Sequence, residues 1–285
     1  MEKIIYIILL IFIVSGCTEN IDLALNSMDT RMLVVEGQIT SDTTSQWIKL
    51  SYTSDYYDTL EYKVNNASVM VSDGIDTCVF SEDPEVAGLY KTKSDYCGIP
   101  GKTYKLTISG IDTDEDGQTE TYTAESKMPD IPLVDSIRLS LEHKFYIDVL
   151  QISIYALDSP EKDDAYMYKL YKNNFLLTDS LSEWRTAEDE LFNGERLEDE
   201  PVIYLNQDID EYKVKGGDLY TLVTSHIPHD YYLFLEEAQE EYRGSNPFSG
   251  NPANISTNIS GPHKACGFFA AYSTDWKEKV FRMEE

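Results

Sequence analysis

Residues 104–109 read Tyr-Lys-Leu-Thr-Ile-Ser and alternate strictly between apolar and polar side chains. Successive side chains of a β-strand point to opposite faces of its sheet, so this stretch predicts a strand with one buried face. Further strand patterns occupy residues 32–39, 47–52, 67–71, 75–80, 88–92 and 119–126. Asp73 and Gly74 separate two of them, and Asp-Gly between apolar runs is a typical hairpin turn. Short strands with turns between them predict an immunoglobulin-like or related Greek-key β-sandwich over residues 31–128.

The pattern is interrupted at residues 128–132, Met-Pro-Asp-Ile-Pro. The two prolines lack amide hydrogens and favour an extended linker between domains. Residues 133–285 are predicted to form a second β-rich domain, with strands at 137–141, 150–156, 166–171, 201–206, 219–225 and 267–272. One helix is predicted near residues 229–243, because apolar residues recur there at helical spacing between Pro228 and Gly244. Residues 176–196 are polar and acidic and receive no assignment.

The N-terminus carries an export signal. Residues 4–14 form an apolar run after Lys3, and the run ends in Val14-Ser15-Gly16-Cys17. The eleven apolar residues are too few to span a bilayer as a helix, so we interpret residues 1–16 as a cleaved signal peptide. Small residues before a cysteine are typical of a bacterial lipobox, in which Cys17 receives a diacylglycerol, and residues 17–30 are then a polar lipidated tether. The alternative is an ordinary secretory signal whose cysteine pairs elsewhere.

The composition is that of a folded and strongly acidic protein. Hydrophobic residues make up 42% of the chain and aromatic residues 12%, which excludes a disordered chain. The formal net charge is −28 at pH 7. Phosphate backbones would repel such a protein, so nucleic acid is excluded as a partner. Anionic lipid headgroups repel it as well, so we expect membrane contact through the acyl chains alone.

The segment Asp112-Thr-Asp114-Glu-Asp116-Gly117 matches the start of a calcium-binding loop, with oxygen ligands at positions one, three and five and glycine at six. Position twelve, where such loops need a bidentate Glu, holds Thr123, and the segment joins two predicted strands. The two interpretations are a solvated hairpin tip and a structural calcium site. No other cofactor is predicted.

Two further groups of residues are candidates for a site. Tyr52, Tyr56 and Tyr57, with Trp47 nearby, crowd one predicted loop of the first domain, where aromatic faces could bind a sugar ring, a peptide or a protein. Alternatively, these aromatic residues fill half-buried strand positions. Cys78 and Cys97 flank a predicted hairpin, and a disulfide between them is one of the pairings that an oxidising compartment allows.

Nothing in the sequence matches a motif of nucleophilic catalysis, whether GxSxG, SxxK or a cysteine in a basic neighbourhood. His226 and His229, with Glu236 and Glu237 downstream, could hold a transition metal, although the HExxH spacing is missing. We therefore predict a non-enzymatic protein without catalytic residues, with an uncharacterised hydrolase as an alternative.

Several segments, taken in order and spacing, resemble a known family. They are residues 33–40 (LVVEGQIT), 98–107 (GIPGKTYKLT), 122–129 (YTAESKMP), 246–249 (NPFS), 256–260 (STNIS) and 267–272 (GFFAAY). The sequence is similar to the domain-of-unknown-function 4249 family of Bacteroidetes outer-membrane lipoproteins over nearly the whole mature chain. The resemblance implies an outer-membrane location, on either side of that membrane, and a TonB-dependent receptor as partner. It implies no established activity. The first half also resembles the carboxypeptidase-regulatory-like sandwich of such receptors, which is an analogy of fold alone.

Taken together, the sequence favours a non-enzymatic outer-membrane lipoprotein that binds a nutrient or contacts a TonB-dependent receptor. A lipid anchor would hold the protein beside its transporter and raise the effective concentration of the pair. A surface adhesin or structural envelope protein is the alternative of a different class.

Overall fold

The computed structural model of the chain describes residues 31–54, 60–144, 146–160, 164–188, 194–242 and 255–283. These residues belong to one compact unit, Arg31–Glu285. The predicted signal peptide and tether with Cys17, and also Tyr56 and Tyr57, lie outside the described residues. Among the residues that the structure describes, no helix is both long enough and apolar enough to cross a membrane.

The first half of this unit consists of short strands in which buried and more exposed side chains alternate. In β7, Tyr104, Leu106 and Ile108 are buried, as the alternation of residues 104–109 predicts. Each strand predicted in this half is present, and the two-residue β3 was too short to predict. The strands are β1 (Leu33–Thr40), β2 (Trp47–Tyr52), β3 (Tyr62–Lys63), β4 (Ser68–Ser72), β5 (Thr77–Glu82), β6 (Leu89–Lys91), β7 (Thr103–Ile111) and β8 (Glu120–Lys127).

The second half is also mainly β and contains the predicted helix. Helix α2 (His229–Tyr242) begins directly after Pro228, as expected. Three short elements lie in the region that received no assignment: β12 (Phe175–Leu176), the 3-10 helix η1 (Leu181–Glu183) and β13 (Arg185–Glu188). The remaining elements are β9 (Leu133–Lys144), β10 (Ile147–Leu157), β11 (Ala165–Lys172), β14 (Arg196–Asn206), the 3-10 helix η2 (Asp210–Tyr212), β15 (Leu219–Ile227) and β16 (Ala265–Val280).

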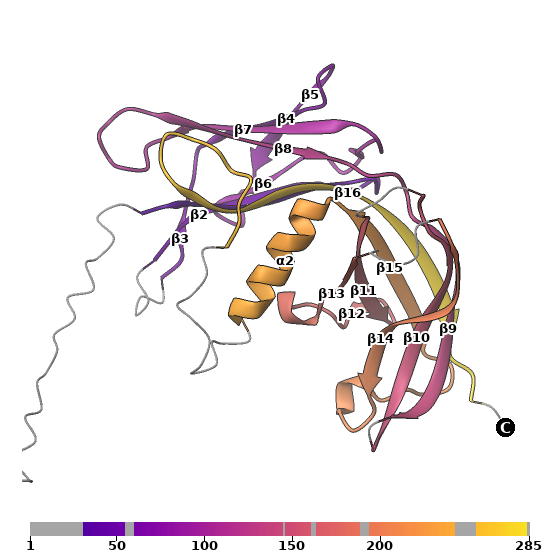
Figure 1. Cartoon of the computed structure of the whole chain (residues 1–285). Coiled ribbons are helices and arrows are strands. Elements are labelled where there is room, and N and C mark those ends of the chain that lie inside the picture. The colour runs from indigo at the N-terminus through magenta and orange to yellow at the C-terminus, as the bar shows by residue number, and fades with distance from the viewer. Residues whose placement is uncertain are drawn as a thin grey trace, which may run out of the picture. The chain divides into compact units, whose positions relative to one another are not determined.

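Most of the strands belong to one continuous sheet of 13 strands, which follows the order β12-β11-β15-β16-β1-β2-β6-β5-β4-β7-β8 (Figure 1). In addition, β13 pairs with β11 and β3 pairs with β2. A separate sheet has the order β14-β10-β9. Within the described residues, β1 and β16 pair in parallel and the other ladders are antiparallel.

Strand β16 joins the two halves of the chain (Figure 1). The sequence predicted a short strand at 267–272 that completes the second domain, but β16 has 16 residues. Its residues 265–272 pair with residues 33–40 of β1, and its residues 273–280 pair with residues 219–226 of β15. The large sheet therefore continues across the predicted boundary at residues 128–133, because β16, the last strand of the second half, pairs with β1 of the first half.

The core of the first half lies inside the curve of the large sheet. Its buried cluster includes Leu33, Ile48, Leu106 and Tyr122 together with Phe269 from β16. Strand β8 returns to β16, where the Ala271 amide donates a hydrogen bond of 2.9 Å to the Ser126 hydroxyl. The mainly β class is thus confirmed. The immunoglobulin-like form of the sandwich stays a prediction.

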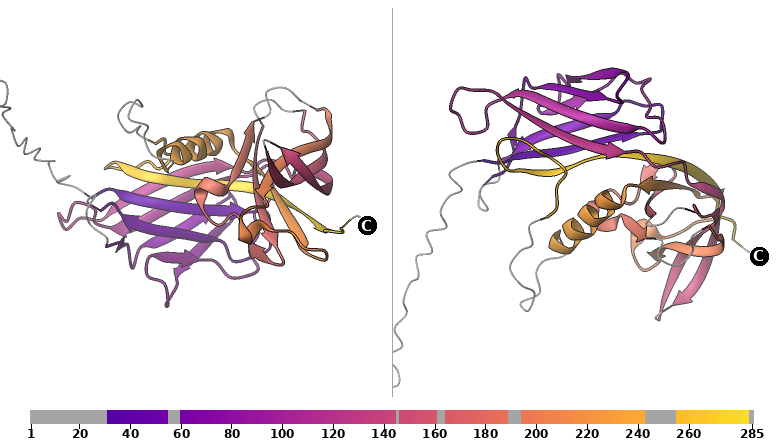
Figure 2. Two further views of the ribbon diagram at one scale, coloured as in Figure 1. Left: turned by 90° about the horizontal axis from the view of Figure 1, so that it is seen from below. Right: turned by 45° about the horizontal axis from the view of Figure 1, so that its top comes forward.

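Strands β11 and β15 of the second half contribute buried residues from both faces. One face contributes Leu170, Tyr220 and Leu222 to a cluster with residues of the β14-β10-β9 sheet. Helix α2 lies beside these strands (Figure 2). The other face forms a cluster that includes Leu235 of the helix. Strand β15 is buried along nearly its whole length although four of its residues are polar, namely Thr221, Thr224, Ser225 and His226.

The linker at residues 128–132 is fastened to the sheet. The Asp130 carbonyl oxygen accepts a hydrogen bond of 2.6 Å from the Ser273 hydroxyl. The same oxygen lies 2.9 Å from His226 Nδ1. The proline-rich segment is therefore held against β15 and β16, although its composition predicts only a linker.

The start of β16 requires a glycine, and this generates a prediction for folding. Gly267 has φ +85°, and a Cβ atom there would lie 2.0 Å from the Val35 carbonyl oxygen of β1. We expect Gly267→Ala to lower the free energy of unfolding of the full chain by more than about 2 kcal/mol, because backbone atoms of the β1–β16 ladder must separate. Urea denaturation measures the loss.

Gly74→Ala is the matched control. Gly74 has a similar φ of +88°, but nothing lies within 4 Å of an added Cβ. Only the backbone strain applies, so the expected loss is about 1 kcal/mol. Equal losses in the two variants would contradict the proposed clash at Gly267.

Candidate functional site

The loop between β7 and β8 gathers the three predicted calcium ligands. The carboxylates of Asp112, Asp114 and Asp116 offer oxygen atoms that all lie within 4.8 Å of one another. Backbone N–H groups hold them in place: the Asp116 amide donates to Asp112 Oδ1 at 3.1 Å and to Asp114 Oδ1 at 3.2 Å. Gly117, at φ +86°, donates its amide to Asp112 Oδ2 at 2.9 Å. The spacing in the sequence thus produces a compact group of carboxylates.

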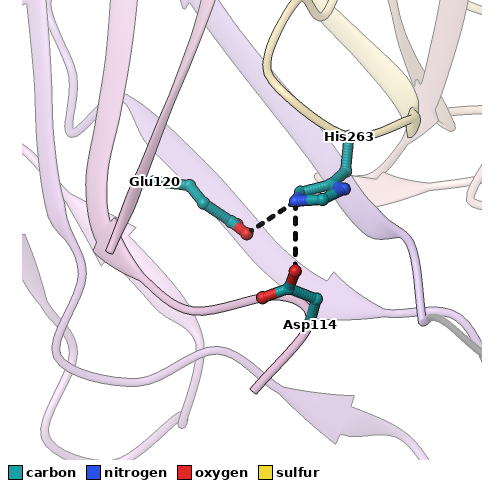
Figure 3. Close-up of side chains that lie close together, drawn as sticks. All are labelled: Asp114, Glu120 and His263. Carbon is teal, nitrogen blue, oxygen red and sulfur yellow. Dashed lines mark ion pairs between the residues drawn. The ribbon is translucent and has the colours of Figure 1, made fainter. Parts of the chain in front are cut away.

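Two further residues extend this group, and the sequence analysis missed both of them. His263 Nε2 lies 3.1 Å from Glu120 Oε1 and 3.6 Å from Asp114 Oδ2 (Figure 3). Asp114, Glu120 and His263 thereby form a second set of potential ligands within 4.8 Å of one another. Counted from Asp112, Glu120 is position nine, which calcium-binding loops also use. Thr123 at position twelve is paired instead with Thr107 in the β7–β8 ladder.

His263 reaches the loop because the segment that precedes it pairs with β8. Ser260 and Thr123 exchange two backbone hydrogen bonds of 2.8 Å. Gly261 lies flat against the buried Tyr122 ring, where an added Cβ would be 2.2 Å from Cδ1. This close approach places His263, two residues later, opposite the carboxylates of the hairpin.

Glu120 is the most enclosed member of the group. Its side chain is 8% exposed. Its Oε2 accepts hydrogen bonds from the Thr113 amide at 3.1 Å and from the Tyr122 hydroxyl at 3.3 Å. Burial raises the pKa of Tyr122, so this residue stays a neutral phenol and a donor at physiological pH. Oε1 is thus the oxygen that faces Asp114 and His263.

The charges around the loop favour a cation. Within the described residues, no Lys or Arg forms an ion pair with Asp112, Asp114, Asp116 or Glu120. Carboxylates that lie close together repel one another unless a cation is shared between them. Oxygen ligands alone suit Ca²⁺, whereas a set that includes an imidazole also suits transition metals. The residues present could therefore hold a divalent cation.

The predicted aromatic group is only partly described. Trp47 is half-buried at the start of β2, which confirms the strand predicted at residues 47–52, and it is in register with Gln38 and Lys91. Tyr56 and Tyr57 lie outside the described residues. Whether the three aromatic residues form one binding surface stays a prediction.

The histidines at the helix entrance do not form a joint metal site. His226 Nε2 lies 3.1 Å from Asp164 Oδ1, and His229 Nε2 lies 2.5 Å from Glu188 Oε1. Neither histidine belongs to any group of potential metal ligands among the described residues. His226 and Asp164 are both buried. Both ring nitrogens of His226 therefore have an oxygen partner, Nδ1 at the Asp130 carbonyl and Nε2 at Asp164.

The cysteine pairing that the sequence allowed is not formed. Cys78 on β5 is half-buried and Cys97 before β7 is exposed, and both are free cysteines, as is Cys266. Burial raises the pKa of the Cys78 and Cys266 thiols, which keeps them protonated and unreactive.

The described residues form a mainly β protein whose β7–β8 loop gathers carboxylates and an imidazole. The profile of the family described as "Domain of unknown function (DUF4249)" matches residues 18–278, and the chain belongs to that family. The expected family is thus confirmed.

Other comparisons add little. No curated protein matches the sequence. Among solved structures, the chain has a likeness to the crystal structure of the β-glucuronidase of Parabacteroides merdae, with 9% sequence identity and a TM-score of 0.23. The match covers 69% of this chain and 23% of the glucuronidase, so the chain spans less than a quarter of that protein.

The buried His226–Asp164 pair generates a prediction for stability. Asp164→Ala leaves a buried ring nitrogen without its partner, and we expect a loss of about 2–4 kcal/mol in the free energy of unfolding. The control is Asp148→Ala, because Asp148 pairs with His143 at 2.8 Å and their side chains are 71% and 68% exposed. Water replaces an exposed partner, so that variant should change little in urea denaturation. A similar loss in both variants would exclude a structural role specific to the buried pair.

Proposed function

We propose that the protein is a non-enzymatic lipoprotein of the outer membrane that binds a nutrient or a TonB-dependent receptor. The observation that carries the proposal is the lipobox at Val14–Cys17, followed by a folded unit whose first strand begins at Leu33. Residues 17–32 between them are polar enough to remain in water, and fully extended they reach about 50 Å. The folded unit would thus stay close to the membrane without being inserted in it.

A tether of this length supports a role as an accessory to a membrane protein. Two proteins held in the same membrane meet at a high effective concentration, so a modest contact is enough for association. The net charge of −28 supports the same arrangement, because it keeps the folded unit away from anionic lipids. The partner is implied by the family resemblance, and the non-enzymatic role by the missing catalytic motifs.

Cys17→Ser tests the anchor. We expect the full-length protein to incorporate a palmitate analogue and to fractionate with the outer membrane, because the acyl chains supply the membrane affinity. The Cys17→Ser variant should lose both properties. Cys97→Ser, which replaces an exposed free cysteine, is the matched control and should retain both. An unmodified Cys17 in the mature protein would refute the proposed location.

Co-purification tests the partner in the same strain. After gentle solubilisation of the outer membrane, we expect a TonB-dependent receptor to be recovered with the wild-type protein. Two results together would instead support an adhesin. No receptor would co-purify with the lipid-labelled protein, and a strain that lacks the gene would lose attachment but grow normally on single nutrients.

We also propose that the β7–β8 loop binds a structural Ca²⁺ ion through Asp112, Asp114, Asp116 and Glu120. The support is that Asp112, Asp114 and Asp116 converge and that Glu120 lies with Asp114 in a second group, without a Lys or Arg partner among the described residues. Such an ion would offset the repulsion among these carboxylates and stabilise the hairpin.

Thermal unfolding of the full chain with and without Ca²⁺ tests this site. If the Kd is about 0.1 mM, 1 mM Ca²⁺ should add about 1.4 kcal/mol of stability. Asp114→Asn should abolish this gain, while Asp208→Asn, which removes the same charge from an exposed turn, should keep it. Equal gains in both variants would mean that calcium only screens the net charge. The same thermal unfolding with Zn²⁺ in place of Ca²⁺ is compared between the wild-type protein and His263→Ala. A smaller Zn²⁺ stabilisation in the variant would show that the imidazole is a ligand.

A further inference from the structure

A small pocket lies between the two sheets of the second half, beside the linker at residues 128–132. Its volume is about 20 Å³, which is enough for one water molecule or for another group of that size. The apolar residues inside it are Val134, Ile154, Ala156 and Leu197. Leu133 and Leu157 also line the pocket and are 59% and 43% exposed, so its opening has an apolar rim.

Two hydroxyl groups at this pocket have no hydrogen-bond partner. Tyr168 on β11 and Thr224 on β15 lie opposite each other in the β11–β15 ladder, and both line the pocket. The two residues are only 5% and 2% exposed. Within the part of the chain that the structure describes, neither hydroxyl forms a hydrogen bond. Buried hydroxyls in folded proteins nearly always have a partner, and here the pocket is the place left for one.

Asp158 gives the pocket a negative charge. It lines the pocket and is 5% exposed. Its carboxylate accepts hydrogen bonds from the Tyr166 hydroxyl at 3.1 Å and from the Gly194 amide at 2.9 Å, which fix its orientation. Burial raises the pKa of Tyr168, and the negative charges of Glu200 and Asp158 raise it further, so the phenol stays neutral. Among the described residues that line the pocket there is no Lys or Arg. These surroundings favour a cation over an anion.

An ammonium group matches this combination of size, charge and hydrogen-bonding groups. It is about as large as a water molecule, and it has three N–H donors and no acceptor. The pocket offers three oxygen-bearing side chains for these donors, namely Tyr168, Thr224 and Asp158. A ligand with an apolar chain would also cover the exposed rim, which a water molecule leaves uncovered. Pockets that bind small molecules commonly combine apolar walls with a few polar groups in this way.

We propose that this pocket binds the head group of small primary alkylammonium ions. The ammonium N–H groups donate to the Tyr168 and Thr224 hydroxyls and to the Asp158 carboxylate. The alkyl chain lies against Leu133 and Leu157 at the rim. The inference goes beyond the proposed function, and neither the lipid anchor nor the receptor enters its test.

Thermal unfolding of the full-length protein at pH 7 with n-butylammonium chloride tests the proposal. If the Kd is about 1 mM, a concentration of about 10 mM should raise the melting temperature by roughly 3 °C. Tetramethylammonium has the same charge but no N–H donor, and n-butanol has the same chain but no charge, so both should have little effect.

Each other outcome of this experiment would overturn the proposal. No rise with n-butylammonium would mean that the pocket holds only an ordered water molecule. An equal rise with tetramethylammonium would mean that the cation only screens the net charge of the protein. An equal rise with n-butanol would mean that the pocket recognises an apolar chain and not an ammonium group.

Tyr168→Phe and Thr224→Val locate the binding, because each removes one hydroxyl and keeps the shape of the side chain. Each should weaken n-butylammonium binding about tenfold in a titration. Tyr220→Phe is the matched control, since the Tyr220 hydroxyl is also buried without a partner among the described residues but does not line the pocket. An equal loss in Tyr220→Phe and Tyr168→Phe would refute the assigned site.

The same variants without ligand distinguish binding from a structural role. Removal of a buried hydroxyl that has no partner should leave the melting temperature unchanged or raise it. A clear fall in the melting temperature of both Tyr168→Phe and Thr224→Val would show that these hydroxyls support the fold, and it would contradict the proposal.

Discussion

The parallel ladder between β1 and β16 is the contact on which the rest of the structure depends. Residues 33–40 lie near the start of the folded unit and residues 265–272 near its end, so the whole intervening chain must close before this ladder forms. Closing a loop of that length costs entropy before any contact is gained, and the ladder must be stabilised by what it buries. Phe269 on one face of β16 joins the first core, while Phe268 on the other face joins the core beneath α2. One strand thereby makes two cores interdependent, so the fold behaves as one unit.

The acidic side chains of the protein fall into two kinds of surroundings. At the Asp73 turn, Lys102 and the backbone amides of Ile75 and Asp76 lower the pKa of the carboxyl well below its usual range. The positive charge of Lys102 thus compensates the negative charge of Asp73. The β7–β8 loop has the same kind of backbone hydrogen bonds but no Lys or Arg partner among the described residues. The two turns have similar backbone hydrogen bonds and differ in charge balance, and this difference is the reason that we propose a cation at the β7–β8 loop and none at the Asp73 turn.

Local patterns account for much of the secondary structure. The two-residue period of residues 104–109 gave β7, and the helical stripe after Pro228 gave α2. The patterns failed where an element was too short to have a period, as in β3, β12 and β13. They also failed for the length of β16, because residues 273–280 carry polar side chains on a strand whose pairing with β15 is set by tertiary contacts. In the site, the spacing of Asp112, Asp114 and Asp116 was readable, and Glu120 at position nine could have been read in the same way. No local signal identified His263, because its approach depends on Gly261 packing against Tyr122.

By itself the sequence determined the mainly β class, the turns and the helix, since each of these rests on residues that are neighbours along the chain. The order and spacing of several segments determined the family. The tertiary structure alone decided that β16 completes both halves, that His226 and His229 face different carboxylates, and that Lys169 lies against Trp184. These are contacts between segments far apart in the chain. The alternation of apolar residues shows which face of a strand is buried, but it does not specify which partner covers that face.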